Sequence, residues 1–154
     1  MTKKEQQQRE MIVAEALTWL KTPYHDHGRI KGAGTDCAMF MLEVFERCGL
    51  IPHLELGRDI PIYSPQHHFH SGTEDYLGWV TRYATKVDRD PLPGDIVMFN
   101  FGRCASHGSI VIGWPMIINA YVGRGVVYAD AANDAELKTK KGESRIAGVY
   151  SYWG

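Results

Sequence analysis

Three residues that lie far apart in the chain, Cys37, His107 and Asn119, have the side chains of a site for nucleophilic catalysis by cysteine. Cys37 follows the glycine-rich stretch Gly28 to Gly34 and stands where an apolar run of helical period begins. Unpaired N–H groups and the positive end of the dipole at a helix N-terminus stabilise a thiolate, the nucleophilic form of cysteine. We therefore expect Cys37 to attack a carbonyl carbon. A buried cysteine that packs as a small apolar residue is the commoner alternative.

His107 and Asn119 could complete this site. His107 is predicted to begin a strand, and Asn119 to lie on the next strand of a hairpin that turns near Gly113 to Met116. Neighbouring antiparallel strands would bring the two side chains together, so that Asn119 fixes the tautomer of His107 and His107 takes the thiol proton. A register shift of one residue would turn Asn119 to the other face. The alternative is a surface histidine and a polar residue beside a turn.

The elements that must position these residues are helices in the first half of the chain. Residues 5–21 are predicted to form a helix that ends before Pro23. A second helix is predicted from Cys37 to a C-cap at Gly49, with Thr35 or Asp36 as its N-cap. A third is predicted over residues 73–86, after a surface excursion through residues 50–72.

From Pro91 onward the pattern changes to short β-rich segments separated by turn residues. Strands are predicted at residues 96–99, 109–112, 117–118, 125–128 and 146–150. Helices followed by strands indicate the α+β class, with an antiparallel sheet packed against helices and Cys37 at the N-terminus of the central helix. We expect residues 1–154 to form one domain.

Composition excludes several classes of protein. Of 154 residues, 44% are hydrophobic and 23% charged, and the net charge is −1, so the chain lacks the basic surface of a nucleic-acid-binding protein. No apolar run reaches about 18 residues, so no membrane span is expected. The N-terminus does not have the pattern of a signal peptide, and three cysteines are too few for a disulfide scaffold. These features favour a soluble protein made in the cytoplasm.

Other polar residues have simpler explanations. Cys48 is expected in the core, and Asp95 is expected to bond N–H groups of its turn. Cys104 and His107 have a C-x-x-H spacing, with His67, His68 and His70 as further candidate ligands, but no second compact pair completes a zinc site. We expect no metal and no cofactor. Arg103 and Arg124 could face an acidic peptide substrate.

Four separated motifs resemble, in order, those of the NlpC/P60 family, the papain-like cysteine peptidases of bacterial cell walls. They are Thr22-Pro23-Tyr24, Gly34-Thr35-Asp36-Cys37, Pro93 to Phe99, and His107 to Gly113, followed by Ile118 to Tyr121 and Gly125 to Val127. The resemblance extends over about Ala14 to Tyr128. The stretch from Tyr63 to Tyr83 looks most like the phage-tail branch of the family.

The resemblance implies a papain-like fold with Cys37 as nucleophile and His107 as general base. It implies that Tyr24, Asp36 and Ser106 bind the substrate or the oxyanion, and the backbone N–H of Cys37 would be a further oxyanion donor. Asn119 falls where the family more often has a second histidine, although papain-like relatives also use asparagine there. Ala38-Met39 replaces the usual Ser-Gly after the cysteine.

The implied substrate is the stem peptide of peptidoglycan, cut at the amide bond that links D-glutamate through its γ-carboxyl to a diamino acid. Phage tail proteins are implied partners, with the protein carried to the wall in the virion, and recycling of wall peptides in the cytoplasm is the neighbouring possibility. Two alternatives belong to other classes. One is a catalytically silent structural module of a phage tail tip, and the other is an acyltransferase that uses the same Cys–His pair.

Overall fold

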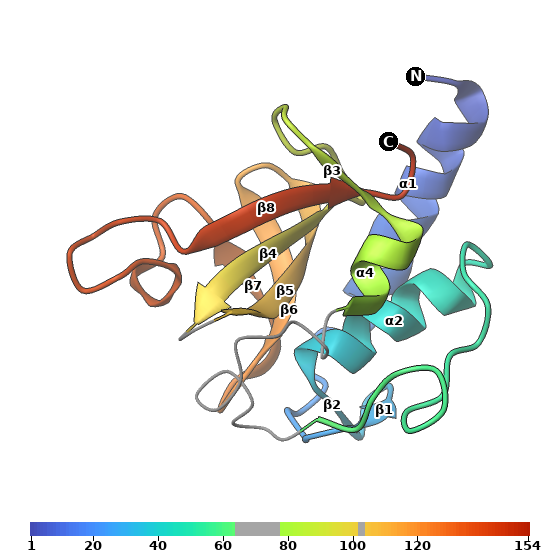
Figure 1. The fold of residues 1–154 in the computed structure, drawn as a ribbon, viewed down its shortest axis with the longest axis horizontal. Helices are drawn as coiled ribbons and strands as arrows, with labels where there is room; N and C mark the ends of the chain where they lie inside the picture. Colours follow the sequence, from blue (N-terminus) through green and yellow to red (C-terminus); the bar gives the residue numbers. More distant parts are fainter. Residues whose placement is uncertain (64–77, 102–103) are drawn as a thin grey trace.

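The centre of the protein, in a computed structural model that describes residues 1–63, 78–101 and 104–154, is a six-stranded antiparallel sheet with helices on one face (Figure 1). The strand order is β3-β8-β4-β5-β6-β7. The strands are β3 Thr85–Val87, β4 Ile96–Phe101, β5 Cys104–Gly113, β6 Met116–Tyr121, β7 Gly125–Asp130 and β8 Ile146–Ser151. A separate pair, β1 Arg29–Ile30 and β2 Gly34–Thr35, lies before the central helix. The predicted α+β class is confirmed.

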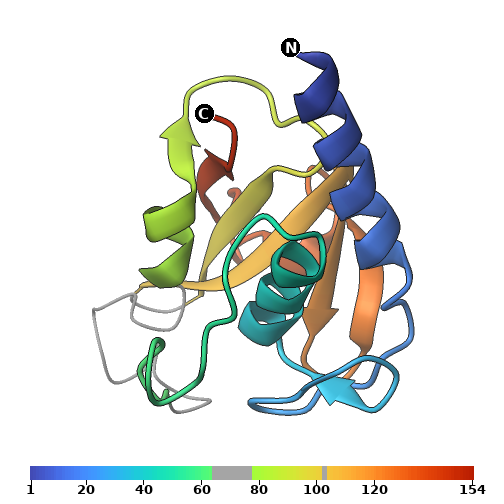
Figure 2. The ribbon, with the colours of Figure 1, turned by 90° about the vertical axis from the view of Figure 1, so that its right-hand side faces the viewer.

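Three α-helices lie on one side of the sheet in the described parts of the chain: α1 Lys3–Leu17, α2 Cys37–Arg47 and α4 Gly78–Tyr83 (Figure 2). The first helix begins two residues earlier than predicted because the Thr2 hydroxyl accepts a hydrogen bond of 3.0 Å from the backbone N–H of Glu5. It also ends earlier, at Leu17, and residues 18–21 form turns. Ile12 and Ala16 are fully buried on its inner face.

The central helix α2 has both of its ends closed by local hydrogen bonds. Asp36 is the N-cap, since its carboxylate accepts a bond of 2.8 Å from the N–H of Met39. At the other end the N–H of Gly49 bonds to Glu46 and that of Leu50 to Phe45, the pattern of a Schellman motif. Gly49 has a φ of 74°, as this motif requires. The predicted C-cap glycine is therefore confirmed, and of the two predicted N-caps Asp36 is the one used.

Two predicted segments differ in part from the structure. Residues 50–63 run along the surface as predicted but are anchored to the core, because Ile51, Leu54, Ile60 and Tyr63 are buried while Arg58 and Ile62 are exposed. The third helix ends earlier than predicted, since α4 ends at Tyr83 and residues 85–87 form β3, which pairs with β8, and residues 73–77 of the predicted range lie outside the described residues. This pairing partner lies more than sixty residues later in the chain, where local periodicity carries no information about it.

Buried residues lie on both faces of the sheet. The larger cluster joins α1 and α2 to Ile96, Met98, Ile110 and Ile118. The smaller one covers the opposite face, where Leu137 of the 3₁₀ helix Ala135–Leu137 packs with Val97, Phe99 and Val111. Among the described residues, no helix combines the length and the apolar character that crossing a membrane requires.

Candidate active site

Cys37 is the first residue of α2, and its side chain is 2% exposed. Its thiol lies 3.9 Å from the carbonyl oxygen of Ser106 in β5. The nucleophile predicted from sequence thus stands at a helix N-terminus, where the helix dipole favours the thiolate. It also contacts the backbone of the residue directly before His107.

Ser106 owes its position to a β-bulge. Phe99 pairs with His107 and Asn100 pairs with Ala105, so Ser106 is the extra residue of β5 that has no partner on β4. A bulge bends its strand and redirects the neighbouring groups. Here it accompanies the approach of the Ser106 carbonyl to the Cys37 thiol. His107 lies within β5, and not at the start of a strand as predicted, because β5 begins at Cys104.

The predicted proximity of His107 and Asn119 is present, with 2.6 Å between His107 Nε2 and Asn119 Oδ1. The amide of Asn119 is oriented by its other hydrogen bond, in which Nδ2 donates to the carbonyl of Val127 at 3.1 Å. Since a carbonyl can only accept, Oδ1 must face His107, and Nε2 must donate to it. The neutral imidazole therefore carries its proton on Nε2 and has its basic lone pair on Nδ1.

Three aromatic rings surround His107. The centroids of Phe101 and Tyr121 both lie 5.6 Å from the imidazole and meet it edge-on, and that of Phe99 lies 5.8 Å away. His107 is 8% exposed. Burial outweighs the hydrogen bond to Asn119 and lowers the pKa of His107 to about 4. The imidazole is therefore neutral at neutral pH, which is the state a general base needs.

Tyr24 lies close to the nucleophile on a segment fixed between β7 and β2. The N–H of Val126 bonds to Thr22, and the N–H of Thr35 bonds to Pro23. A side chain at Gly125 would collide with the Thr22 carbonyl, so a glycine is needed where these two backbones meet. Burial, followed by the negative charges of Cys37 and Asp36, raises the pKa of Tyr24, so its hydroxyl stays protonated.

Asp36 belongs to a buried network in addition to its role as a cap. One carboxylate oxygen accepts from the N–H of Met39, and the other accepts from the N–H of His27 and the hydroxyl of Tyr63. Burial raises the pKa of Asp36, and these hydrogen bonds oppose the rise. The resemblance implied that Asp36 lines the substrate pocket, whereas here both of its oxygens bond to the protein.

Tyr63, which was not predicted as part of the site, packs against His27. Their rings meet edge-on with centroids 4.6 Å apart, and His27 Nε2 lies 2.7 Å from the carbonyl oxygen of Tyr63. The charge of Cys37 contributes to the raised pKa of Tyr63, after burial and Asp36, which places Tyr63 near the thiol. The sequence signal was weak, because Tyr63 lies in a segment without periodic pattern.

The other candidate ligands do not form a metal site in the described residues. There, no group of three or more histidine, cysteine or acidic side chains is arranged to hold a metal ion. His67, His68, His70 and Arg103 lie outside the described residues. Cys48 is half-buried and packs against the main core.

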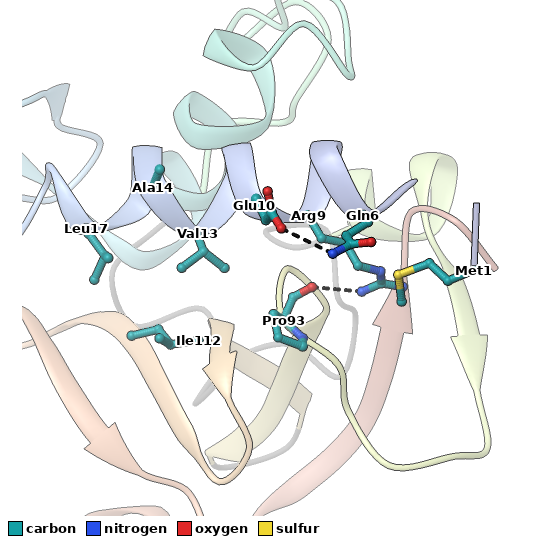
Figure 3. Close-up of a pocket in the computed structure, with 9 residues that line it drawn as sticks. All are labelled: Met1, Gln6, Arg9, Glu10, Val13, Ala14, Leu17, Pro93 and Ile112. Atoms are coloured by element: carbon teal, nitrogen blue, oxygen red, sulfur yellow. Dashed lines mark hydrogen bonds between the residues drawn. The ribbon is translucent and has the colours of Figure 1, made fainter. Parts of the chain in front are cut away.

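A separate apolar hollow of about 510 Å³ lies between α1 and the sheet (Figure 3). Val13 and Leu17 of α1 face Ile112 across it, and Arg9 closes one side by donating a bond of 2.9 Å to the Pro93 carbonyl. None of the six predicted site residues lines this hollow. It is therefore distinct from the site around Cys37.

Comparison with known proteins gives one family. The sequence profile of the NlpC/P60 family matches residues 21–142, which include Cys37, His107 and Asn119. No protein with a curated description matches the chain.

Solved structures resemble the chain at low sequence identity. The NlpC/p60 domain of the peptidoglycan hydrolase SagA has a TM-score of 0.54 and 23% identity, over 79% of this chain and 88% of that one. NlpC2 from Trichomonas vaginalis has a TM-score of 0.65 and 18% identity, over 94% and 48%. The peptidoglycan hydrolase RipB from Mycobacterium tuberculosis has a TM-score of 0.61 and 15% identity, over 99% and 68%. This chain thus spans less than half of NlpC2, and the likeness establishes a shared fold.

Proposed function

The chain belongs to the NlpC/P60 family and has its α+β fold, and we propose that it is a cysteine peptidase that hydrolyses amide bonds in the stem peptides of peptidoglycan. One arrangement carries the proposal. Cys37 begins α2, and its thiol lies beside the backbone carbonyl of Ser106. His107, which directly follows Ser106, donates a hydrogen bond to the side chain of Asn119. SagA and RipB, which share the fold, are peptidoglycan hydrolases by name, and this supports the choice of substrate.

Each step of the proposed reaction has a residue to perform it. The thiol of Cys37 gives its proton to Nδ1 of His107, and the thiolate attacks the carbonyl carbon of the amide. The backbone N–H of Cys37 and the hydroxyl of Tyr24 stabilise the oxyanion of the tetrahedral intermediate. His107 then protonates the leaving amine, which leaves an acyl-enzyme. A water molecule that gives its proton to His107 hydrolyses the thioester and releases the acid and the free thiol.

The bond and the biological setting rest on the sequence resemblance. We propose cleavage between D-glutamate, linked through its γ-carboxyl, and the diamino acid. We also propose that the protein is made in the cytoplasm and reaches the wall as part of a phage tail. The tail assignment depends on the stretch from Tyr63 to Tyr83, most of which lies outside the described residues.

Mass spectrometry of purified stem peptides tests the proposal. The parent protein, Cys37→Ala and the matched control Cys48→Ala are each incubated with peptides of several wall types. Cleavage by the parent and by Cys48→Ala, and none by Cys37→Ala, is expected, and the product masses locate the bond. If none of the three proteins cuts any peptide, the proposed peptidase activity is wrong and a catalytically silent module is favoured.

A further inference from the structure

Arginines lie over two of the aromatic rings that surround His107. The guanidinium carbon of Arg145 is 4.8 Å from the centroid of Phe101, and that of Arg124 is 5.8 Å from the centroid of Tyr121. Figure 1 shows why Arg145 reaches this place, since the start of β8, which follows Arg145, lies beside the end of β4, which carries Phe101. Two cations therefore lie over rings that contact the proposed general base.

The two arginines differ in whether an acidic side chain of the described residues pairs with them. Arg124 forms an ion pair with Glu136, whereas none of the described acidic side chains pairs with Arg145. Two backbone carbonyls hold the Arg145 guanidinium, with Nε 3.0 Å from Lys138 and Nη1 3.3 Å from Asn100. These bonds and the Phe101 ring fix the orientation of the group and leave other N–H groups, including those on Nη2, for a ligand.

The hydroxyl of Tyr121 lies in the field of the same arginine. Burial and the charge of Glu136 raise the pKa of Tyr121, while the charges of Arg124 and Arg145 oppose that rise. Tyr121 is half-buried, and its hydroxyl forms no hydrogen bond with the described parts of the chain. The ring of Tyr121 and the Phe101 ring that lies under Arg145 thus both border the ring of His107.

We propose that Arg145 and Tyr121 form a subsite for a carboxylate of the substrate, beside the bond that is cut. A guanidinium binds a carboxylate through two parallel hydrogen bonds, and a phenol can donate a third. The inference rests on the proposed function, and that function supplies the ligand. A glutamate linked through its γ-carboxyl necessarily keeps a free α-carboxylate, and the diamino acid has a carboxyl group of its own. Both groups lie within one residue of the scissile amide.

Matched peptides test this subsite. Three stem peptides are compared, one with both carboxylates free, one amidated at the glutamate and one amidated at the diamino acid. For the parent protein we expect amidation of one of these groups to lower kcat/KM about tenfold or more, which identifies the bound carboxylate. Arg145→Gln should lower kcat/KM about tenfold for the peptide with both carboxylates free. It should leave kcat/KM nearly unchanged for the amidated peptide that lacks the bound carboxylate. Lys4→Gln, which removes a charge from an exposed position on α1, should behave as the parent does.

Two further variants separate binding from folding. Arg145→Lys keeps the charge and should retain part of the preference, and Tyr121→Phe removes only the hydroxyl and should cost about threefold with the free peptide. Thermal melting of each variant identifies any that unfold. The subsite would be overturned if both Arg145→Gln and Tyr121→Phe lowered kcat/KM equally for the free and the amidated peptides. It would also be overturned if neither variant lowered kcat/KM.

Binding to Cys37→Ala separates this inference from the peptidase itself. Titration calorimetry with the same three peptides measures the preference without any cleavage. If Cys37→Ala binds the free peptide more tightly than one of the amidated peptides, and the double variant Cys37→Ala/Arg145→Gln does not, the subsite is supported even if the parent cuts no peptide. Equal binding of all three peptides, or binding of none, would overturn the subsite. If the parent nevertheless cleaves a peptide, the proposed peptidase activity remains supported.

Discussion

Arg9 of α1 and Asp95, the residue directly before β4, form a buried ion pair, with 2.8 Å between Nη1 and Oδ1 and side chains 4% and 0% exposed. Burial alone would raise the pKa of Asp95, but hydrogen bonds from Arg89, from the N–H of Leu92 and from Arg9 hold it below its ordinary value. The bond from Leu92 confirms the predicted turn role of Asp95. The same carboxylate also fixes α1 to the sheet.

Replacing Arg9 should therefore destabilise the fold. Arg9→Met leaves Asp95 buried with only part of its compensation, and we expect the free energy of unfolding to fall by about 3 kcal/mol. Urea denaturation measures the change. The control is Arg58→Met, which breaks the exposed pair with Asp59 and should have little effect. Equal losses in the two variants would show that the buried pair has no special role.

The two described free cysteines should differ in reactivity. Burial and the charge of Glu15 raise the pKa of Cys48 to about 11, whereas the helix N-terminus favours the thiolate of Cys37. In a Cys104→Ser background, alkylation by iodoacetamide followed by mass spectrometry should modify Cys37 at a lower pH than Cys48. Adding His107→Ala should move the Cys37 profile to higher pH. Coincident profiles for the two cysteines would contradict an activated thiol.

The buried imidazole of His107 should make stability depend on pH. Its pKa falls from 6.5 to about 4 on folding, so between these values the unfolded chain binds a proton that the folded protein does not. The stabilisation is complete above pH 6.5 and is lost as the pH falls toward 4, by roughly 3 kcal/mol. Denaturation at pH 7.5 and 4.5 should show this loss in the parent and in His25→Gln, but not in His107→Gln. The same pH dependence in His107→Gln would assign it to other groups.

Asn119 should act through His107. Asn119→Ala removes the acceptor at Nε2, so the imidazole is no longer held in one tautomer, and we expect kcat to fall about tenfold to a hundredfold with a smaller change in KM. Nitrogen NMR of labelled histidine should show the proton on Nε2 in the parent and a mixture of tautomers in the variant. Asn119→His, which supplies a ring nitrogen as an acceptor in place of the amide oxygen, should keep part of the activity that Asn119→Ala loses. Unchanged tautomer populations in Asn119→Ala would exclude this role.

Gly123, in the turn between β6 and β7, and Gly125, the first residue of β7, make a matched pair. Gly123 and Gly125 have φ values of 80° and 76°, but a Cβ at Gly123 would meet nothing, whereas one at Gly125 would strike the Thr22 carbonyl. Gly123→Ala should cost about 1 kcal/mol for the backbone conformation alone. Gly125→Ala should cost clearly more and should also lower activity, because Tyr24 follows the displaced segment. Thermal denaturation and peptide cleavage measure both effects, and similar results for the two variants would refute the contact.

Local pattern was sufficient to predict the groups that lie near one another in sequence or on adjacent strands. The N-terminus of α2 follows from Asp36 and the apolar run after it, and the contact between His107 and Asn119 follows from a hairpin. The same reasoning placed His107 at a strand start, because the bulge at Ser106 has no signature in the residue types around it.

Features that depend on residues distant in the chain could not be predicted from the local sequence pattern. Tyr63 reaches Asp36 from a segment without periodicity, so neither its burial nor its hydrogen bond could be predicted. Arg145 has no motif of its own and becomes notable only when β8 sets it beside Phe101. In both cases tertiary packing places the residue, and the local sequence does not.

The position of β8 has a consequence for how the protein is made. Residues 146–151 do not extend the edge of the sheet but lie between β3 and β4, strands that precede them in the chain. During synthesis, the helices and the hairpins of β4 to β7 can form first, while β3 has no neighbour until β8 emerges from the ribosome. The completed sheet, and with it Arg145 over Phe101, therefore appears only after residues 146–151 have left the ribosome.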